Sequence, residues 1–358
     1  MINLGELVAG RYEIISHIGR GGMQEVFLAR DILLDVNVAL KTPQPGQAER
    51  RFKNSAIIAA KINHHNVAKT LDYVEEGDRR FLIEEFVDGE TLEHKLSKFG
   101  FLDPHLGAHV LHHLAKGIRA SHRAEVIHRD LKPSNVMTSR GVNLYDLKIT
   151  DFGIATLTEE VFDEAHRQGD LTNTTSGTVK GALPFMAPEM MFRAPGEKVD
   201  CAVDIWSLGA MMFRLLTGEY PFGLFLEAAV NVKTKTRKDW PAFMTSKAQF
   251  RPLAIELQRI VDSCLSYDAA ERPTADKLVA ECEALCYLAT EREEGVVSNL
   301  IQHGYSGFVT SGQRQVFFSM ESVYGTVKPD PHTNRSICFS SFPGSPQQRA
   351  HPVLLLKS

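Results

Sequence analysis

Up to about residue 90, the chain consists mainly of short runs of β-branched and aromatic residues, a pattern typical of strands. Glycines at Gly19, Gly21 and Gly22 separate the first two runs and predict a hairpin with a turn at its tip. One stretch within this part has a helical pattern. The predicted strands are 12–18, 26–28, 36–40, 67–73 and 80–87, and the predicted helix is 49–62. We therefore expect a small β-rich unit at the N-terminal end.

From about Thr91 onward, apolar residues recur at steps of three and four, which gives helices with one apolar face. This pattern ends near Thr290. The positions that show it best are Leu106, Val110, Leu111, Leu114, Ala115 and Ile118, and later Ile205, Leu208, Met212 and Leu215. A larger helical unit is therefore predicted to follow the β-rich one.

Strand formers and turn residues return after the charged segment 291–294. The predicted strands of this third part are 295–297, 304–309, 316–318, 336–339 and 353–356. We interpret 291–294 as a polar joint between two separate cores, so the chain up to this joint is expected to fold without the tail.

Composition narrows the class of protein. Hydrophobic residues make up 43% and charged residues 23% of the 358 positions, as in ordinary globular proteins. The net charge of −4 gives no reason to expect that the whole protein binds nucleic acid. Five scattered cysteines without Cys-x-x-Cys spacing argue against a disulfide framework or a zinc site. No apolar stretch is long enough for a membrane span and the N-terminus lacks signal-peptide features, so a cytoplasmic protein with no membrane contact is expected.

Five polar residues have the types and spacing that phosphoryl transfer requires. Lys41 lies in a predicted apolar strand, where a buried ammonium needs an anionic partner such as a phosphate. Asp130, Lys132 and Asn135 fall within six positions, and Asp151 follows another predicted strand. Such a reaction needs a carboxylate to orient the attacking hydroxyl, oxygen ligands for Mg²⁺ and cations near the phosphates. The pattern thus points to phosphoryl transfer.

The order of these motifs resembles the protein kinase superfamily over residues 10 to about 288, and the opening around Tyr12 and Gly19 most resembles bacterial serine/threonine kinases. The motifs are at 128–135, 151–153, 187–189, 204–209 and 271–273. The resemblance implies an α+β, two-lobed fold with an N-lobe at about 10–87 and a C-lobe at about 88–288. It also implies Mg²⁺-dependent transfer of the γ-phosphate of ATP to serine or threonine of a protein substrate, with autophosphorylation expected.

The same resemblance implies a role for each matching position. Asp130 would be the catalytic base, Lys132 would steady the transferred phosphate, and Lys41 would hold the α- and β-phosphates. Asn135 and Asp151 would bind Mg²⁺. The ATP pocket would contain Ile18, Gly19, Gly21, Gly22, Val26, Ala39, Lys41, Glu84, Glu85, Val87 and Met137, with Glu85 and Val87 offering backbone groups to adenine. Three further positions, Glu189, Arg272 and Asp204, would be structural: an ion pair between the first two, and a brace under the catalytic loop.

Four positions depart from the family pattern: Gln24 replaces the third glycine of the loop, Ala182 replaces a threonine, Ser55 replaces the helix glutamate, and Glu84 replaces an apolar residue. Our hypothesis is that Glu84, on a strand next to that of Lys41, supplies the anion that Ser55 cannot. Alternatively, Glu84 turns outward or the site has degenerated. In that case the chain would be a pseudokinase that binds nucleotide and acts as a scaffold or switch.

The segment 154–186 is rich in threonine, and Arg129 beside the proposed base is the family's usual receptor for a phosphate on this loop. We expect autophosphorylation between Thr156 and Thr178, although a threonine-rich loop is also compatible with a simple polar linker.

The tail, 294–358, resembles a cold-shock domain, a five-stranded OB barrel with aromatic residues on two adjacent strands. The matching positions are 295–297, 304–309 and 316–318. Ser306 interrupts the first aromatic motif, Ser319 stands where a histidine is expected, and His303 stands where a lysine is expected. From Arg292 onward there are six Lys or Arg and four Asp or Glu, so the net charge is only +2. Weak binding of single-stranded RNA or DNA is one expectation; a protein-docking or autoinhibitory module is the other.

Overall fold

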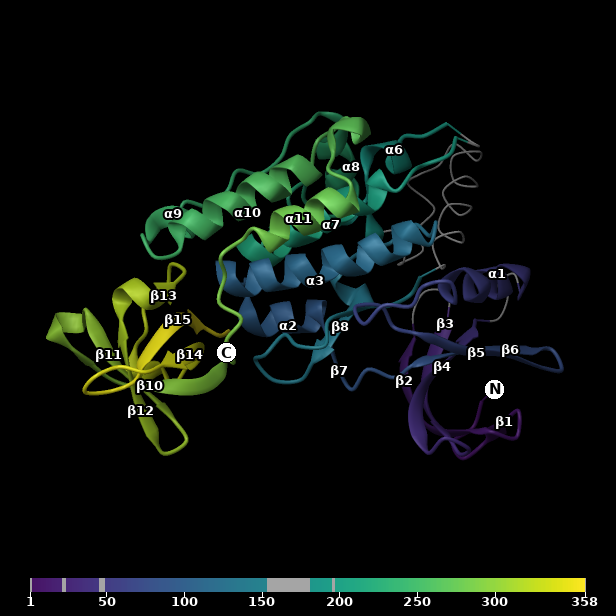
Figure 1. Ribbon diagram of the computed structural model, residues 1–358, viewed down its shortest axis with the longest axis horizontal. Helices are drawn as coiled ribbons and strands as arrows, with labels where there is room; N and C mark the ends of the chain where they lie inside the picture. Colours follow the sequence, from purple (N-terminus) through teal and green to yellow (C-terminus); the bar gives the residue numbers. More distant parts are fainter. Residues whose placement is uncertain (1, 21–23, 45–48, 153–180, 195–196, 358) are drawn as a thin grey trace.

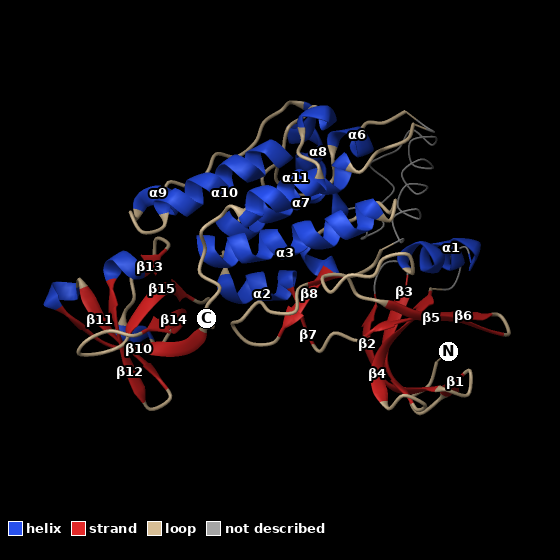
Figure 2. Cartoon of the chain, in the orientation of Figure 1, coloured by secondary structure: helices blue, strands red, loops and turns tan. Residues whose placement is uncertain are grey.

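The structure is a computed structural model that describes residues 2–20, 24–44, 49–152, 181–194 and 197–357. Its described parts form a strand-rich unit, a helical unit and a β-barrel in chain order, as expected (Figure 1). Figure 2 shows the helices gathered between the two strand-rich ends. None of the described helices is long and apolar enough to cross a membrane.

The strand-rich unit is a six-stranded sheet in the order β1-β2-β3-β4-β6-β5, antiparallel throughout. Its apolar face includes Tyr12, Phe27 and Phe81, and helix α1 packs on β6 through Phe52 and Leu82. The elements are β1 (Leu7–Val8), β2 (Tyr12–Arg20), β3 (Gln24–Asp31), β4 (Val36–Pro43), α1 (Glu49–Ala59), β5 (Thr70–Glu76) and β6 (Arg79–Glu85). The sheet therefore sets β4 and β6 side by side, which decides the geometry of the site below.

One strand of this sheet was not predicted, and one predicted strand begins later than expected. The two-residue strand β1 has no alternation long enough to be recognised. The run predicted from Val67 is not part of β5 at its start, because Ala68 donates its backbone N–H to Ile149 O (2.9 Å) across the junction with the helical unit. The predicted run 67–73 is thus divided: its start pairs with the helical unit, and the rest belongs to β5 of the sheet.

The helical unit is built around α3 and α7, whose inner faces are fully buried. Asp103 caps α3 by accepting from the N–H groups of His105 and Leu106, and Pro104 occupies the first turn, where its missing N–H is tolerated. The helices are α2 (Leu92–Phe99), α3 (Pro104–Arg123), α6 (Pro188–Met191), α7 (Ala202–Thr217), α8 (Phe225–Lys233), α9 (Phe243–Ser246), α10 (Arg251–Cys264) and α11 (Ala275–Glu283). A small sheet of β7 (Gly89–Thr91), β8 (Val136–Ser139) and β9 (Lys148–Ile149) lies where this unit meets the first.

The tail forms a closed barrel in the order β12-β11-β10-β14-β15, closed by pairing of β12 with β15. Its own core includes Val309, Phe318 and Phe339. The strands are β10 (Glu293–Ile301), β11 (Ser306–Ser311), β12 (Arg314–Ser319), β14 (Ser336–Phe342) and β15 (Arg349–Leu355), with the short β13 (Val323–Tyr324) paired to β15. The expected five-stranded barrel is confirmed.

The segment 291–294, predicted as a polar joint, is exposed only in part. Arg292 is buried, and its Nη2 donates to Asp103 Oδ1 at 3.0 Å. Asn143 and Arg292 also exchange two hydrogen bonds, one from the Arg292 N–H (2.7 Å) and one to its carbonyl (3.0 Å). Four barrel residues join the core of the helical unit: Tyr324, Cys338, Leu354 and Leu356. Charged residues in a row suggested solvent exposure, but here one of them pairs with a buried aspartate across the interface.

Candidate active site

A cleft with a volume of about 1110 Å³ lies between the strand-rich and helical units. Most of the residues predicted for ATP and its metal ion line it: Ile18, Gly19, Val26, Ala39, Lys41, Glu84, Glu85, Val87, Lys132, Asn135, Met137 and Asp151. Gly21 and Gly22 lie outside the described residues. Asp130 is not part of the lining, but its carboxylate is in contact with Lys132, which is.

Lys41 lies at the buried back of the cleft between two carboxylates. Its Nζ is 2.5 Å from Glu84 Oε2 and 2.7 Å from Asp151 Oδ1. The predicted contact with Glu84 is therefore present. It is not between directly opposed residues, since Ala39 is opposite Glu84 and Lys41 is opposite Leu82, so the pair is a diagonal one on a single face of the sheet.

The three charges shift one another's pKa. Burial raises the pKa of Glu84, despite the attraction of Lys41. Burial also opposes ionisation of Asp151, but the positive charge and hydrogen bond of Lys41 outweigh it and hold the pKa of Asp151 below its usual value. For Lys41, burial disfavours the ammonium form, yet Asp151 and Glu84 together raise its pKa. Lys41 is thus held in its protonated form.

Gln24 also contacts these charged residues, through Asp151. Its Nε2 donates to Asp151 Oδ1 at 2.9 Å, and the side chain is buried. The sequence marked Gln24 only as a missing glycine. Its contact with a residue 127 positions away could not be foreseen from the sequence.

The residues of the helical unit that the sequence predicts to be catalytic lie on one short segment. Lys132 Nζ is 2.8 Å from Asp130 Oδ2, and Asn135 Nδ2 donates to Asp130 O (2.8 Å) and Oδ2 (3.1 Å). The 3-10 turn Pro133–Asn135 brings the amide back over the carboxylate. Because both oxygens of Asp130 accept hydrogen bonds from Lys132 and one also accepts from Asn135, the orientation of the carboxylate is fixed.

Asp204 braces this segment from below, as the sequence predicted. It is fully buried and accepts from the backbone N–H groups of His128 (2.8 Å) and Arg129 (2.7 Å) and from His122 Nε2 (2.9 Å). Burial works against its charge, but these contacts keep the pKa of Asp204 below the usual value. The brace holds Arg129 at a φ of 65°, a conformation that L-residues rarely adopt.

The sequence profile described as "Protein kinase domain" matches residues 12–282 of the chain. The chain belongs to the protein kinase domain family. The two units that form the cleft are therefore the N-lobe and C-lobe of a kinase, and the expected fold class is confirmed. The matched region ends before the barrel.

The curated relatives are bacterial kinases. The serine/threonine-protein kinase PrkC of Bacillus subtilis is 33% identical over 237 residues, which cover 65% of this chain and 34% of PrkC. The serine/threonine-protein kinase pkn2 of Myxococcus xanthus is 33% identical over 286 residues, 78% of this chain and 33% of pkn2. PknA of Corynebacterium glutamicum is 36% identical over 230 residues, 61% of this chain and 45% of PknA. The chain thus spans between a third and a half of the length of these relatives.

The other kinase positions singled out from the sequence also have clear places. Arg272 of the C-lobe donates to both carboxylate oxygens of Glu189, at 2.6 and 2.9 Å, as expected of a structural pair. Ser55 and Ala182 are both buried. The threonines expected to carry phosphate, from Thr156 to Thr178, lie outside the described residues. Among the described residues, no group of three or more His, Cys, Asp or Glu side chains is arranged to hold a metal ion.

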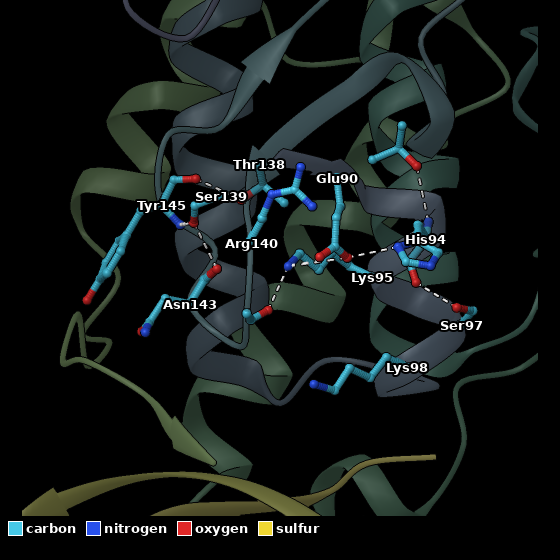
Figure 3. Close-up of polar contacts among 12 residues, drawn as sticks. Glu90, His94, Lys95, Ser97, Lys98, Thr138, Ser139, Arg140, Asn143 and Tyr145 are labelled. Carbon is cyan, nitrogen blue, oxygen red and sulfur yellow. Dashed lines mark hydrogen bonds and ion pairs between the residues drawn. The ribbon is translucent and has the colours of Figure 1, made fainter. Parts of the chain in front are cut away.

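The rim of the kinase cleft was not predicted. Glu90, His94 and Arg140 line it, and Figure 3 shows Glu90 between His94 and Lys95. His94 Nδ1 donates to Glu90 Oε2 (2.8 Å), and the buried Lys95 donates from Nζ to Gly141 O (2.6 Å). These residues come from β7, from α2 and from the loop after β8, and no motif marks them. A buried lysine in a helix with an otherwise apolar inner face is the one signal that sequence reasoning could have used.

Proposed function

We propose that the chain is a serine/threonine protein kinase that transfers the γ-phosphate of ATP to protein hydroxyls. The observation that carries this proposal is the convergence of Asp130, Lys132 and Asn135 with Lys41 and Asp151 at one cleft. A degenerate site would be expected to lose at least one of these groups or its placement. The departures at Gln24 and Glu84 instead add hydrogen bonds within the site, so nothing in it favours the pseudokinase alternative.

The geometry supports a separate role for each of these residues. Asp130 would accept the proton of the attacking hydroxyl, and its carboxylate is oriented for this by Lys132 and Asn135. Lys132 lies two residues beyond the base and would neutralise charge on the transferred group. Lys41 would hold the α- and β-phosphates from the back of the cleft.

The donor set fits Mg²⁺. Asn135 Nδ2 is committed to Asp130, which leaves its Oδ1 as the amide atom able to meet a cation, and Asp151 adds a carboxylate. Mg²⁺ commonly binds one or two protein oxygens together with substrate phosphates. Once bound, the ion would neutralise charge on the β- and γ-phosphates. We therefore assign Asn135 and Asp151 as its ligands.

The first test measures phosphate transfer. The purified chain is incubated with Mg²⁺, radiolabelled ATP and a generic basic protein substrate, and labelled residues are identified by phosphoamino-acid analysis. We expect label on serine or threonine, and Asp130→Asn should lower the rate by at least ~10²-fold because a positioned base contributes about that factor. Absence of transfer by the wild-type chain, with nucleotide binding intact, would refute the enzymatic proposal and favour the pseudokinase.

A second function is supported by one feature of the barrel. Phe308 on β11 and Phe317 on β12 are directly opposed, half-buried and 5.8 Å apart between ring centroids. Partly exposed aromatic pairs on adjacent strands can stack on unpaired bases. We propose that this face of the barrel binds single-stranded RNA or DNA weakly, since the tail's net charge of +2 adds little attraction.

A further inference from the structure

Lys41 needs a fixed anion if its ammonium is to meet phosphates in a defined place, and no described side chain of the α1 helix provides one. From Arg50 to Ala59 the helix contains no aspartate or glutamate. The residue aligned with the usual glutamate is Ser55, which is buried but carries no charge. The helix is nonetheless packed in place, with Phe52 and Ala56 against Leu82 of β6.

We propose that Glu84 is the residue that positions Lys41 for the ATP phosphates, from within the sheet rather than from the helix. This inference deepens the proposed kinase function and rests on it. The Glu84 carboxylate lies 2.5 Å from Lys41 Nζ, and both side chains are buried. A buried carboxylate beside a buried ammonium is held in place because either charge would be costly alone.

The sheet makes this anchor rigid. Four consecutive residue pairs, from Val38 opposite Glu85 to Lys41 opposite Leu82, join β4 to β6. Side chains two positions apart on a strand face the same side, so Lys41, Ala39 and Glu84 share the cleft face. The separation of the two charges is therefore fixed by sheet hydrogen bonds and not by where the helix lies.

This has a consequence for control of activity. When the anion comes from the helix, an outward movement of the helix breaks the ion pair and disables the lysine. Here the pair lies within one sheet, so helix movement leaves it intact. Lys41 would remain positioned in every arrangement of α1, and control of this kinase would have to act on another part of the site.

The test measures nucleotide affinity and not catalysis, in an Asp130→Asn background that cannot turn over. Dissociation constants are determined for Mg-ATP, whose phosphates need Lys41, and for adenosine, which has none. Glu84→Gln, which is nearly isosteric, should weaken Mg-ATP binding roughly tenfold or more and leave adenosine binding within about twofold. Glu75→Gln is the matched control: this strand carboxylate also pairs with a lysine, Lys53 at 3.1 Å, but neither residue lines the cleft, and the change should alter neither constant.

A double-mutant cycle separates positioning from general damage. If Glu84 acts through Lys41, then Lys41→Met with Glu84→Gln should bind Mg-ATP no more weakly than Lys41→Met alone. Adding Ser55→Glu to Glu84→Gln should restore part of the lost affinity by returning the charge to the helix. Glu84→Asp keeps the charge on a shorter side chain and provides a folded variant should the uncharged one fail to fold; it should lose only part of the affinity.

Either of two results would overturn the proposal: full Mg-ATP affinity in Glu84→Gln, or additive losses in the cycle. An equal loss for adenosine would overturn it too, because Glu84 would then be shaping the pocket. Failure of phosphate transfer by the wild-type chain would refute the kinase activity alone, since these binding constants do not depend on transfer.

Discussion

Gln24 occupies the position where the kinase family has the third glycine of its loop, and it binds the carboxylate that we assign to Mg²⁺. Asp151 Oδ1 accepts both from Gln24 Nε2 (2.9 Å) and from Lys41 Nζ (2.7 Å). A cation approaching this oxygen must compete with two donors. Hydrogen bonds to an ionised group contribute more than neutral ones, so we expect this competition to weaken metal binding.

Removing the amide should therefore ease metal binding. We expect Gln24→Ala to lower the Mg²⁺ concentration that gives half-maximal phosphate transfer by roughly threefold or more, since a donor to the Asp151 carboxylate is lost. The measurement is a titration of activity with Mg²⁺ at saturating ATP. Glu25→Gln, at the next position of β3, is the control and should leave the titration unchanged. A higher Mg²⁺ requirement in Gln24→Ala would mean that the amide orients Asp151 for the metal.

The two unusual residues of the cleft differ in how far the sequence could predict them. Glu84 could be connected to Lys41 because both lie on strands whose pairing the fold dictates and because Ser55 left a charge unpaired. The sequence could not indicate that the two are diagonal, since register depends on the bulges and turns of the whole sheet. Gln24 gave no such indication, because its partner belongs to the other lobe.

At the scale of elements, alternation predicted the existence of most strands but not their limits. The aromatic strands of the barrel illustrate this. Ser306 and Ser319, both departures from the cold-shock pattern, prove to be opposite one another, where β11 begins and β12 ends. Gly307 follows, and a Cβ there would lie 2.5 Å from Asn299 O. Close approach of three strands explains this glycine, and a single sequence does not reveal such an approach.

The strands β11 and β12 form the face that we predict to bind single-stranded RNA or DNA. Phe308→Ala or Phe317→Ala in the full chain should weaken binding of a fluorescent single-stranded RNA or DNA by roughly 1–3 kcal/mol, because each ring can stack on a base. Fluorescence anisotropy at several salt concentrations measures this, and affinity should fall as salt rises. Tyr145→Ala removes an exposed aromatic of the C-lobe and is the control.

Two outcomes distinguish the alternatives for the barrel. If no oligonucleotide binds the wild-type chain even at low salt, the aromatic pair of β11 and β12 would instead belong to a protein-docking face. If Tyr145→Ala weakens binding as much as the barrel variants do, the contact is not specific to the barrel.

At the scale of the molecule, the barrel is packed against the C-lobe and not merely connected to it by a linker. Tyr324 contacts the rings of Phe101, Phe243 and Phe250, with centroids 5.0–5.9 Å apart. At the end of α2, the backbone carbonyl of Lys98 accepts from the Lys357 N–H (2.7 Å), and the Lys98 ammonium pairs with Glu294 (2.8 Å). The barrel thus holds one end of α2, which lies beside it in Figure 1. His94, near the other end of this helix, lines the cleft.

The sequence could not predict this docking. Residues 291–294 read as a hydrophilic linker because their partners are distant: Asp103 in one case and Lys98 in another. The apolar residues that cover the interface, such as Leu354 and Leu356, fit a strand of an isolated barrel equally well. Which face of a strand packs inside its own barrel and which packs on a neighbour is decided by tertiary packing, and alternation does not encode it.

The buried pair between Arg292 and Asp103 provides the last prediction, that the kinase and the barrel unfold as one unit. Arg292→Met leaves the Asp103 carboxylate buried without its cation and should destabilise the chain by about 3–5 kcal/mol. The double variant Arg292→Met with Asp103→Asn should recover part of this loss, because no buried charge remains and asparagine still caps α3. Urea unfolding is followed by the fluorescence of Trp206 and Trp240 in the C-lobe and by an extrinsic label at Ser345→Cys in the barrel, in a background where the exposed Cys201 and Cys286 are replaced by serine. Both probes should report a single midpoint that shifts equally in each variant. Separate midpoints in the wild-type chain would show that the interface contributes little, and the polar-joint interpretation would then be the better account of the molecule.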